Sequence, residues 1–578
     1  MILSTASLRL NRNSDLRVSV LSPGKDAGDA TGLPFRPYVS GGRSFLRIPP
    51  FPGVPQRQFE EAESFPTDLD RLAAELRHFR VGGSYWGAQP TLPQGCVLVR
   101  STAALGAANQ IAGGRPVVSW QVAELPGNRE AATRVIVGDC DPWHVLSSAN
   151  AVVLERGDEL RVIASLLDVP CYVLDRLTGE SCLANDRASD LVGTCFAGVS
   201  FRNPFTGKPM PLLEAVELCG FWRAMIDSNR GIGAGLGFAF WKQDHVARML
   251  WSGSGTLPFL RSAAAAPLSG SVALWRSKGP PRAVEELERR NASTIEIEDG
   301  FLRSHGLGAD CVPPLSITVD RLGAYFDASR PSELEELLQY GDFDDALIRR
   351  ARSLRRLIVD TGLGKYEKGA APIARPAGMR RHILVPGQVA DDRSVQLGGC
   401  GLTSNLELLK RVREQAPESY IIYKPHPDVV AGHRRGSIPD RICLQFADEI
   451  SGGASIASLI SMVDEVHVNT SQAGFEALLR QKQVVTYGVP FYAGWGLTTD
   501  FGQVPSRRTA RRSIDELVAA TLLLYPRYLD PVTGLPCPAE ILVQRLSEKD
   551  QRSTGLLVGL RRLQGRCRRG LAAVRDWF

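Results

Sequence analysis

The sequence has no long hydrophobic run. Its longest apolar stretch extends from Gly231 to Phe240 and is rich in glycine and alanine, whereas a membrane-spanning helix needs ~20 apolar residues. The start of the chain, residues 1–15, does not have a basic start followed by an apolar core, the pattern that marks a secretory signal. We therefore expect no integral membrane segment and a cytoplasmic protein.

Several motifs of common site types are also missing. The eleven cysteines are scattered without a CxxC pair, which argues against a disulfide scaffold or a structural zinc site and for reduced thiols. No GxGxxG follows an early strand, no Walker A lysine is present, and no acidic cluster resembles a DxD metal motif. Dinucleotide-dependent and P-loop enzymes are thus disfavoured.

Positive charge is concentrated at one end of the chain. The formal net charge is +6, and residues 556–578 hold six arginines against one aspartate, a balance of +5. The body is nearly neutral, so we expect no binding of nucleic acid. The segment 551–578 has the spacing of a basic amphipathic helix, which binds anionic membrane surfaces. A solvated terminal helix is the alternative interpretation.

Length and composition indicate a globular protein of several parts. The 578 residues exceed what one hydrophobic core supports, and the length predicts about three or four folding units. Apolar residues make up 44% and charged residues 22% of the chain, as in ordinary globular domains.

The most informative region extends from Ile383 to Asp500. Short β-branched or aromatic runs, such as ILVPG, YIIYK and EVHVN, alternate here with helical patterns. This alternation is typical of an α/β fold with a parallel sheet. In open α/β sheets ligands bind at the carboxyl ends of the strands, and polar residues follow these predicted strands: Asp391, Asp392, His426, Asn469, Thr470 and Ser471.

Longer strings in this region carry a family resemblance. QVxxD, KPHPD, NTSQAGFEALL and PFYAGWGLTxD, preceded by EDGFLRSHGLG and PPLSITVD, occur in one order. They resemble the KpsC-type retaining β-Kdo transferases of bacterial capsule assembly, over roughly residues 222–550. The resemblance implies a GT-B fold, a pair of Rossmann-like lobes. It also implies transfer of Kdo from CMP-β-Kdo to a lipid-linked acceptor, phosphatidylglycerol that already carries Kdo, by metal-free chemistry without a cofactor.

Three residues are expected to carry the reaction. The family's QVxxD spacing, counted from Gln388, selects Asp392 as the nucleophile that forms a covalent glycosyl-enzyme at C2 of Kdo. Glu298, at the end of the strand-like STIEIED, is the expected second carboxylate for proton transfer with the acceptor. His426 lies between two prolines that stiffen the chain, and we expect it near the reacting centre. The alternative for Asp391 and Asp392 is a pair of acids that cap the next helix.

The remaining candidates are expected to bind the donor. The NTSQ string at a strand-to-helix junction offers hydroxyls and free backbone N–H groups to a phosphate, although ordinary N-capping is the alternative interpretation. Arg303, in the loop that follows the strand-like STIEIED, offers a guanidinium that suits the carboxylate of the sugar itself. The donor-binding candidates are Gln388, Lys424, Asn469, Thr470, Ser471, Glu476 and Arg303. Asp320 we expect to be structural, and the PFYAGWG loop to be either a ligand cover or a packed turn.

The chain divides into four predicted parts. Residues 1–221 form a degenerate N-terminal glycosyltransferase-like module with a loosely ordered start, and residues 222–380 the acceptor-side lobe. Residues 381–550 form the CMP-sugar-binding lobe, and residues 551–578 the basic tail on the inner face of the cytoplasmic membrane. The basis for a degenerate copy is an internal echo: Asn203-PFTGKPMP resembles Asp530-PVTGLPCP at a constant offset of 327 residues. An unrelated N-terminal domain is the alternative.

Two other functions remain open from the sequence. An enzyme of the same fold could use another CMP-activated ulosonic or sialic acid. A non-catalytic scaffold for capsule assembly or export, which binds other assembly proteins, is the hypothesis of a different class.

Overall fold

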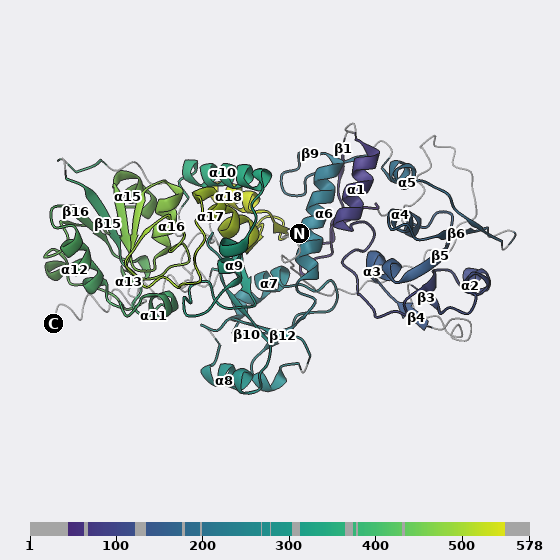
Figure 1. Ribbon diagram of the computed structural model, residues 1–578, viewed down its shortest axis with the longest axis horizontal. Helices are drawn as coiled ribbons and strands as arrows, with labels where there is room; N and C mark the ends of the chain where they lie inside the picture. Colours follow the sequence, from purple (N-terminus) through teal and green to yellow (C-terminus); the bar gives the residue numbers. More distant parts are fainter. Residues whose placement is uncertain are drawn as a thin grey trace. The chain divides into compact units, whose positions relative to one another are not determined.

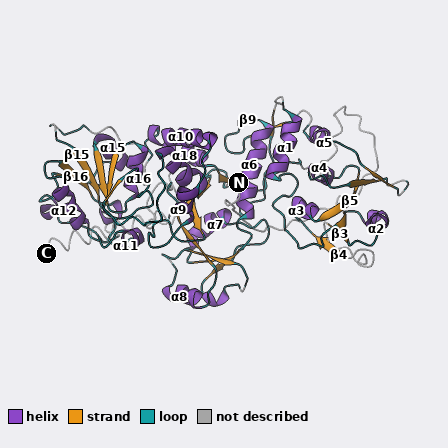
Figure 2. Cartoon of the chain, viewed as in Figure 1, coloured by secondary structure: helices purple, strands orange, loops and turns teal. Residues whose placement is uncertain are grey.

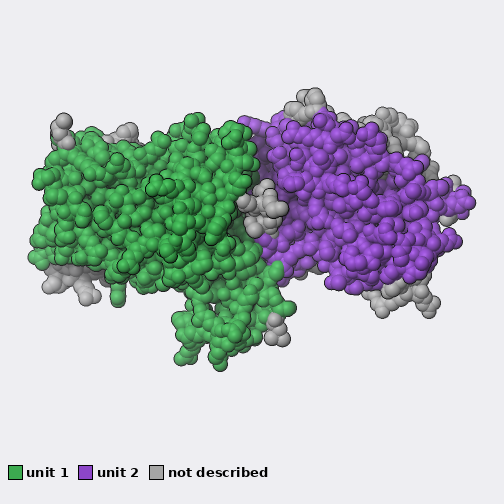
Figure 3. Space-filling view, viewed as in Figure 1, with its two compact units in different colours: residues 1–2, 231–249, 258–578 green, residues 3–230, 250–257 purple. Residues whose placement is uncertain are grey.

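The computed structural model describes residues 44–62, 67–121, 134–175, 178, 180–196, 199–267, 269–277, 279–302, 312–363, 374–376, 378, 380–430 and 434–548. It divides into two compact units, coloured in Figure 3. Of the described residues, unit 1 contains those within 231–249 and 258–548, and unit 2 contains those within 44–230 and 250–257.

Unit 1 contains a six-stranded sheet in which every pair is parallel, here called the parallel sheet. Its order is β17-β16-β15-β18-β19-β20, so the chain starts in the middle, moves outward, and returns to the other side of the first strand. The strands are β15 (His382–Pro386), β16 (Tyr420–Lys424), β17 (Glu449–Ile450), β18 (Glu465–Val468), β19 (Gln483–Thr486) and β20 (Thr499–Asp500). The direction of winding therefore reverses between β15 and β18, where open α/β sheets form their ligand crevice.

Helices surround this sheet (Figure 1). They are α11 (Arg393–Gly398), α12 (Asn405–Gln415), α13 (Pro427–Val430), α14 (Asp440–Cys443), α15 (Ile456–Met462) and α16 (Gln472–Leu479). The apolar positions of α12 recur at helical spacing, so Leu408, Leu409 and Val412 pack with Ile383 and Val385 of β15 in one core. Burial of this apolar stripe holds α12 against β15, whose carboxyl end leads into the segment from Gly387 onward.

A second sheet of unit 1, here called the mixed sheet, has the order β11-β10-β12-β13-β14-β21-β22. The strands are β10 (Ile232–Leu236), β11 (Phe259–Leu260), β12 (Ser271–Leu274), β13 (Thr294–Asp299), β14 (Ser316–Asp320), β21 (Pro526–Leu529) and β22 (Pro536–Cys537). The pairs from β11 to β13 are parallel and those from β13 to β22 antiparallel. Residues 526–537 thus lie in the mixed sheet, although the sequence placed them with the 381–550 lobe, because the chain returns after β20.

The helices of the mixed-sheet half are α7 (Phe240–Met249), α8 (Pro281–Arg289), α9 (Glu333–Tyr340), α10 (Asp345–Asp360), α17 (Ile514–Val518), the π-helical η6 (Ala519–Leu524) and α18 (Ala539–Ser547), with a short 3-10 turn η4 (Ala263–Ala265). Asp344 caps α10 by accepting a hydrogen bond from the Leu347 amide. Figure 2 shows the alternation of helices and strands along both halves.

Unit 2 repeats the strand order of the parallel sheet. Its six-stranded sheet runs β4-β3-β2-β5-β6-β7 and is parallel except for the edge strand β7. The strands are β2 (Cys96–Val99), β3 (Val117–Gln121), β4 (Arg134–Val137), β5 (Ala149–Glu155), β6 (Cys171–Leu174) and β7 (Ser181–Leu183). The helices are α1 (Leu69–Phe79), η3 (Thr102–Ala104), α2 (Leu105–Ala112), α3 (Pro142–Ser147), α4 (Leu160–Leu166), α5 (Ala188–Cys195) and α6 (Leu212–Asp227).

The internal sequence echo corresponds to a repeated hairpin. In unit 2, β8 (Ser200–Arg202) and β9 (Pro209–Met210) pair antiparallel beside β1 (Glu61–Ala62), as β21 and β22 do beside β14. The Gly207 amide donates to the Asn203 carbonyl and the Gly534 amide to the Asp530 carbonyl, both at 2.8 Å. The two glycines have φ of 70° and 72°, a region that favours glycine.

No helix within these described ranges is both long and apolar enough to cross a membrane.

Candidate functional site

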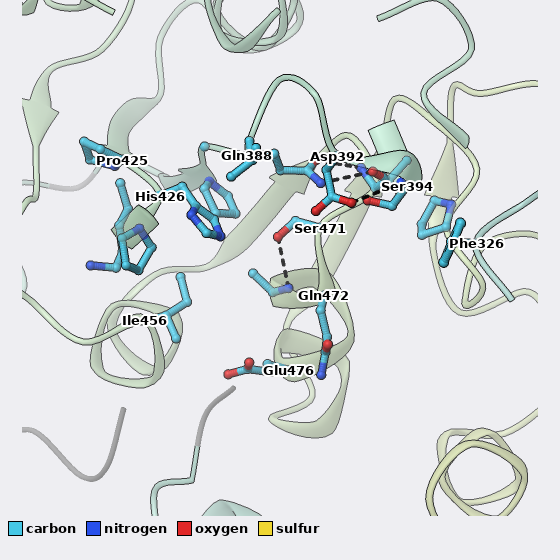
Figure 4. A pocket seen from close by; sticks show the side chains of 18 of the residues that line it. Phe326, Gln388, Asp392, Ser394, Pro425, His426, Ile456, Ser471, Gln472 and Glu476 are labelled. Atoms are coloured by element: carbon cyan, nitrogen blue, oxygen red, sulfur yellow. Dashed lines mark hydrogen bonds between the residues drawn. The ribbon is translucent and has the colours of Figure 1, made fainter. Parts of the chain in front are cut away.

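A cavity opens at the carboxyl ends of β15, β16 and β18 (Figure 4). In the figure His426 lies on one side of Ser471 and Asp392 on the other, with Glu476 further along α16. The lining comes mainly from the parallel sheet's edge, and two residues, Tyr325 and Phe326, come from the mixed-sheet half. The full lining is Tyr325, Phe326, Pro386, Gly387, Gln388, Val389, Asp392, Ser394, Lys424, Pro425, His426, Pro427, Ile456, Thr470, Ser471, Gln472, Ala473, Glu476, Pro490 and Phe491.

The start of α16 forms the floor of this cavity. Ser471 is the N-cap, and its hydroxyl accepts a hydrogen bond from the Ala473 amide at 3.2 Å. The Ser471 carbonyl accepts one from the Tyr492 hydroxyl at 2.5 Å, which fixes the entry to the helix. A helix start that opens into a cavity presents backbone N–H groups and the positive end of the helix dipole, so it favours an anion.

A glutamine connects the two strands on either side of the crevice. The Gln388 side-chain amide donates to the Thr470 hydroxyl at 3.0 Å, and its oxygen accepts from the Thr470 amide at 2.9 Å. Both side chains are buried. Gln388 therefore holds the residue before the N-cap of α16 in place, with its amide directed at protein rather than at open space.

The geometry of His426 defines which ring nitrogen carries a proton. Its Nδ1 accepts a hydrogen bond from the Asp428 amide at 3.1 Å, so in the neutral ring the proton resides on Nε2. Lys424, which precedes it at the end of β16, is buried and donates to the Ala454 carbonyl at 2.5 Å. The KPHP string thus supplies one positive charge and one imidazole donor at the same strand end.

The two neighbouring aspartates differ in surroundings. Asp391 is about half exposed and forms an ion pair with Arg434 at 3.1 Å. Asp392 lines the cavity, and its Oδ1 accepts a hydrogen bond from the Ser394 amide at 3.3 Å as the N-cap of α11. The capping that the sequence offered as an alternative is therefore present, and Asp392 combines it with exposure to the cavity.

Glu298 is not among the residues that line the cavity. Its Oε1 is 3.6 Å from Nη1 of Arg393, and the Arg393 guanidinium stacks over the cavity-lining Phe326 with its Cζ 5.3 Å from the ring centroid. Burial, together with the charge of Asp299, raises the pKa of Glu298 to about 8, although Arg393 opposes this shift. Glu298 is thus mostly protonated at neutral pH.

Aromatic side chains of both halves form one wall of the cavity. Phe301 of the mixed-sheet half has its ring centroid 4.6 Å from that of Phe491 and 4.8 Å from that of Tyr325. The Gln472 side chain, in the first turn of α16, donates to the Phe301 carbonyl at 2.6 Å. The two halves of unit 1 are therefore joined directly beside the candidate anion site.

The comparisons with known proteins concern this same unit. The family model described as "Capsule polysaccharide biosynthesis protein" matches residues 271–347 and 345–528. The chain is 34% identical to the β Kdo 2,7 transferase of Thermosulfurimonas dismutans KpsC, covering 54% of this chain and 98% of that one, with a TM-score of 0.44. For the β Kdo 2,4 transferase of the same KpsC the identity is 33%, the coverage 55% and 98%, and the TM-score 0.48.

The chain belongs to the KpsC-type capsule polysaccharide Kdo transferase family.

Curated relatives match over part of their length. Capsule polysaccharide modification protein LipA of Neisseria meningitidis is 39% identical over 351 residues, which is 60% of this chain and 50% of LipA. Lipopolysaccharide-processing protein LpsZ of Rhizobium meliloti is 47% identical over 249 residues, which is 42% of this chain and 56% of LpsZ. The chain thus spans about half the length of the curated relatives it matches.

Within this KpsC family member, the structure brings most of the sequence candidates to one place. The cavity is lined by Gln388, Asp392, Lys424, His426, Thr470, Ser471 and Glu476. Asn469 is not among the lining residues, because its side chain turns away and donates to the Leu402 carbonyl at 2.6 Å. Glu298 is not among them either, and Arg303 lies outside the described residues.

Some lining residues carried no recognisable signal in the sequence. Tyr325 and Phe326 follow β14 and reach the cavity from the other half of unit 1. Only long-range folding brings them there, so no local pattern could have identified them.

Asp320 is structural, as expected, because its carboxylate accepts hydrogen bonds from the amides of Leu322, Gly323 and Glu333 and from the Tyr525 hydroxyl. Among the residues that the structure describes, no His, Cys, Asp and Glu side chains gather as a metal-binding group.

Proposed function

We propose that this protein is a retaining β-Kdo transferase of GT-B type, which moves Kdo from CMP-β-Kdo to a lipid-linked Kdo acceptor of the capsule. The observation that carries the proposal is the cavity, where seven candidates spread from Gln388 to Glu476 meet at the crevice between β15 and β18. The two T. dismutans chains that this chain matches over 98% of their length are β Kdo transferases, which supports the choice of sugar.

The donor's single phosphate would bind at the start of α16. Thr470 and Ser471 supply hydroxyls there, and His426 supplies its Nε2 proton from the opposite side. Lys424 adds a positive charge in the same wall. These groups stabilise the negative charge that develops on the leaving CMP, which is the main electrostatic requirement of the reaction.

Asp392 would act as the nucleophile. Its carboxylate oxygen forms a bond to C2 of Kdo while the bond from C2 to the phosphate oxygen breaks, and CMP leaves with the electron pair. The acceptor hydroxyl then attacks C2, the bond to Asp392 breaks, and two inversions leave the configuration unchanged.

Glu298 would take the proton of the acceptor hydroxyl. Glu298 is not among the lining residues, and Arg393, its ion partner, stacks over the wall residue Phe326 and so links Glu298 to the cavity. The base must also be ionised, and with a pKa of about 8 its active form increases as the pH rises toward that value.

We propose that unit 2 is a degenerate copy of the donor-binding half. It shares the strand order and the hairpin, but the N-cap of its α4 is Glu159, where α16 has Ser471. The Glu159 carboxylate pairs with Arg47, and Asp158 lies 3.5 Å from Arg100. An ionised carboxylate at this N-cap cannot donate a hydrogen bond to a phosphate as the Ser471 hydroxyl can, so one intact donor site per chain is expected.

The basic segment 551–578 lies outside the described residues. We propose that it holds the protein on anionic lipid at the inner face of the cytoplasmic membrane, where a lipid-linked acceptor is available. Flotation with phosphatidylglycerol vesicles, with and without this segment, tests the placement separately from catalysis.

The test of the function is a transfer assay with purified protein, CMP-Kdo and a Kdo-lipid mimic. Wild type should transfer Kdo, Asp392→Ala should lose activity by at least ~10³-fold, and the matched variant Asp391→Ala should stay within about threefold because exposed ion pairs contribute little. Transfer by Asp392→Ala at the wild-type rate would contradict the assignment. CMP-sialic acid as a second donor tests whether the site requires Kdo.

A further inference from the structure

An asparagine behind the cavity holds the segment that carries Asp392. Asn405 is the first residue of α12 and is 9% exposed. Its Oδ1 accepts a hydrogen bond from the Gln388 amide at 2.9 Å, and its Nδ2 donates to the Gln388 carbonyl at 2.7 Å. One side chain therefore binds both polar groups of the Gln388 main chain, as a neighbouring strand would.

The same side chain binds a third segment. Asn405 Nδ2 also donates to the Gly436 carbonyl at 2.9 Å, so both of its donors and its oxygen are engaged. Gly436 has φ of 133°, and a Cβ there would lie 2.8 Å from the Gln388 carbonyl oxygen. The Ala390 amide completes the contact by donating to the Arg435 carbonyl at 3.0 Å. We name Asn405, Gln388 and Gly436 together the Asn405 clamp.

The clamp connects the segment that carries Asp392 with the start of α16, the candidate phosphate site. Four residues after Gln388 comes Asp392, and the Gln388 side chain holds Thr470 next to Ser471. A displacement of the Gln388 peptide therefore shifts the Asp392 carboxylate relative to the start of α16. Since a misplacement of ~1 Å can reduce a reaction rate about 100-fold, the position of this peptide has kinetic consequences.

We propose that Asn405 is a positioning residue that sets the placement of Asp392 relative to the start of α16. Its catalytic consequence rests on the proposed function. Asn405 does not line the main cavity and would touch neither donor nor acceptor.

Asn405→Asp is the sharpest test. The replacement has the same shape, but it puts an oxygen where Nδ2 now faces the carbonyls of Gln388 and Gly436. Two hydrogen bonds become repulsive contacts while the bond from the Gln388 amide is retained. Ser404→Ala is the matched control, because it removes the N-cap bond of the same helix and leaves the clamp intact.

The expected kinetic result separates positioning from folding. With CMP-Kdo and acceptor, Asn405→Asp should lower kcat about 10- to 100-fold, while KM for the donor and the Kd for CMP change less than about threefold. Ser404→Ala weakens the start of the same helix but should keep the wild-type kcat. An equal loss of kcat in both variants, or an unchanged kcat in Asn405→Asp, would overturn the proposal.

A second measurement does not depend on the reaction. Hydrogen exchange of the amides of residues 388–392 should become at least ~10-fold faster in Asn405→Asp, with exchange in α16 unchanged. Unaltered exchange in this segment would overturn the clamp even if no transfer is detected. If wild type transfers no sugar while exchange responds as stated, the proposed function fails and the clamp stands.

Discussion

The substitution Glu298→Gln should remove the contribution of this buried carboxyl to the pH dependence of stability in unit 1. Glutamine has the shape of a protonated glutamate and does not ionise. In wild type, burial and Asp299 raise the pKa of Glu298 from its ordinary value of 4.5 to about 8. Between these two values the folded protein binds more protons at Glu298 than the unfolded chain does.

The sign and size follow from this difference. Because the folded state holds the extra proton, stability falls as pH rises from about 4.5 to 8, by up to ~1.4 kcal/mol per pH unit. Over the whole window this amounts to at most about 5 kcal/mol. Glu298→Gln has no ionisable group at this position. The free energy of unfolding of the variant, relative to that of wild type, should therefore increase steadily with pH.

Hydrogen exchange of the β13 and β14 amides provides the assay. Wild type and Glu298→Gln are compared at the same pH, from about 5.5 to 8.5, so that the intrinsic exchange rate cancels. Arg393→Met should move the wild-type transition to higher pH, since Arg393 now lowers the pKa of Glu298. Parallel pH slopes for wild type and Glu298→Gln would refute this account of the buried carboxyl.

Three further predictions concern individual side-chain contacts of unit 1. Glu335→Ala leaves Arg508 buried without the carboxylate that it contacts at 2.7 Å, and it should lower the free energy of unfolding by about 3–5 kcal/mol. Arg508→Met should lower the free energy of unfolding by less, about 1–3 kcal/mol, because Glu335 still forms its ion pair with Arg507. Chemical denaturation of the two variants measures both values, and the opposite order would contradict this prediction. Gln388→Ala removes both hydrogen bonds to Thr470 and should weaken CMP binding about 10-fold, measured by calorimetry. Undiminished affinity would show that these two hydrogen bonds do not support the candidate phosphate site. Ser513→Ala breaks a capping box and should cost ~1 kcal/mol, and a changed CMP affinity would be unexpected.

Local patterns predicted the elements of unit 1 well. The string NLELLKRVREQ forms α12 from Asn405 to Gln415, because its apolar stripe and the Ser404 cap specify a helix without help from distant residues. The Ser513-Ile-Asp-Glu516 string has the local pattern of a capping box, and both reciprocal hydrogen bonds are present.

Longer-range features could not be read from local patterns. The return of β21 and β22 to the mixed sheet depends on pairing with β14, more than 200 residues earlier. Asn405 was missed because its side chain acts on main-chain groups 17 and 31 residues away. The packed-turn interpretation of the PFYAGWG loop agrees with the full burial of Trp495, whereas Pro490 and Phe491 line the cavity and a role as ligand cover stays a prediction.

The central claim is that Asp392 forms a covalent bond to the transferred sugar. Intact-mass spectrometry of the full chain after brief incubation with CMP-Kdo, without acceptor, tests it most directly. The account predicts an adduct of one Kdo residue per chain, located by peptide mapping at Asp392, absent in Asp392→Ala and lost on addition of acceptor. An adduct on another residue, or acceptor-dependent transfer that persists unchanged in Asp392→Ala, would contradict it.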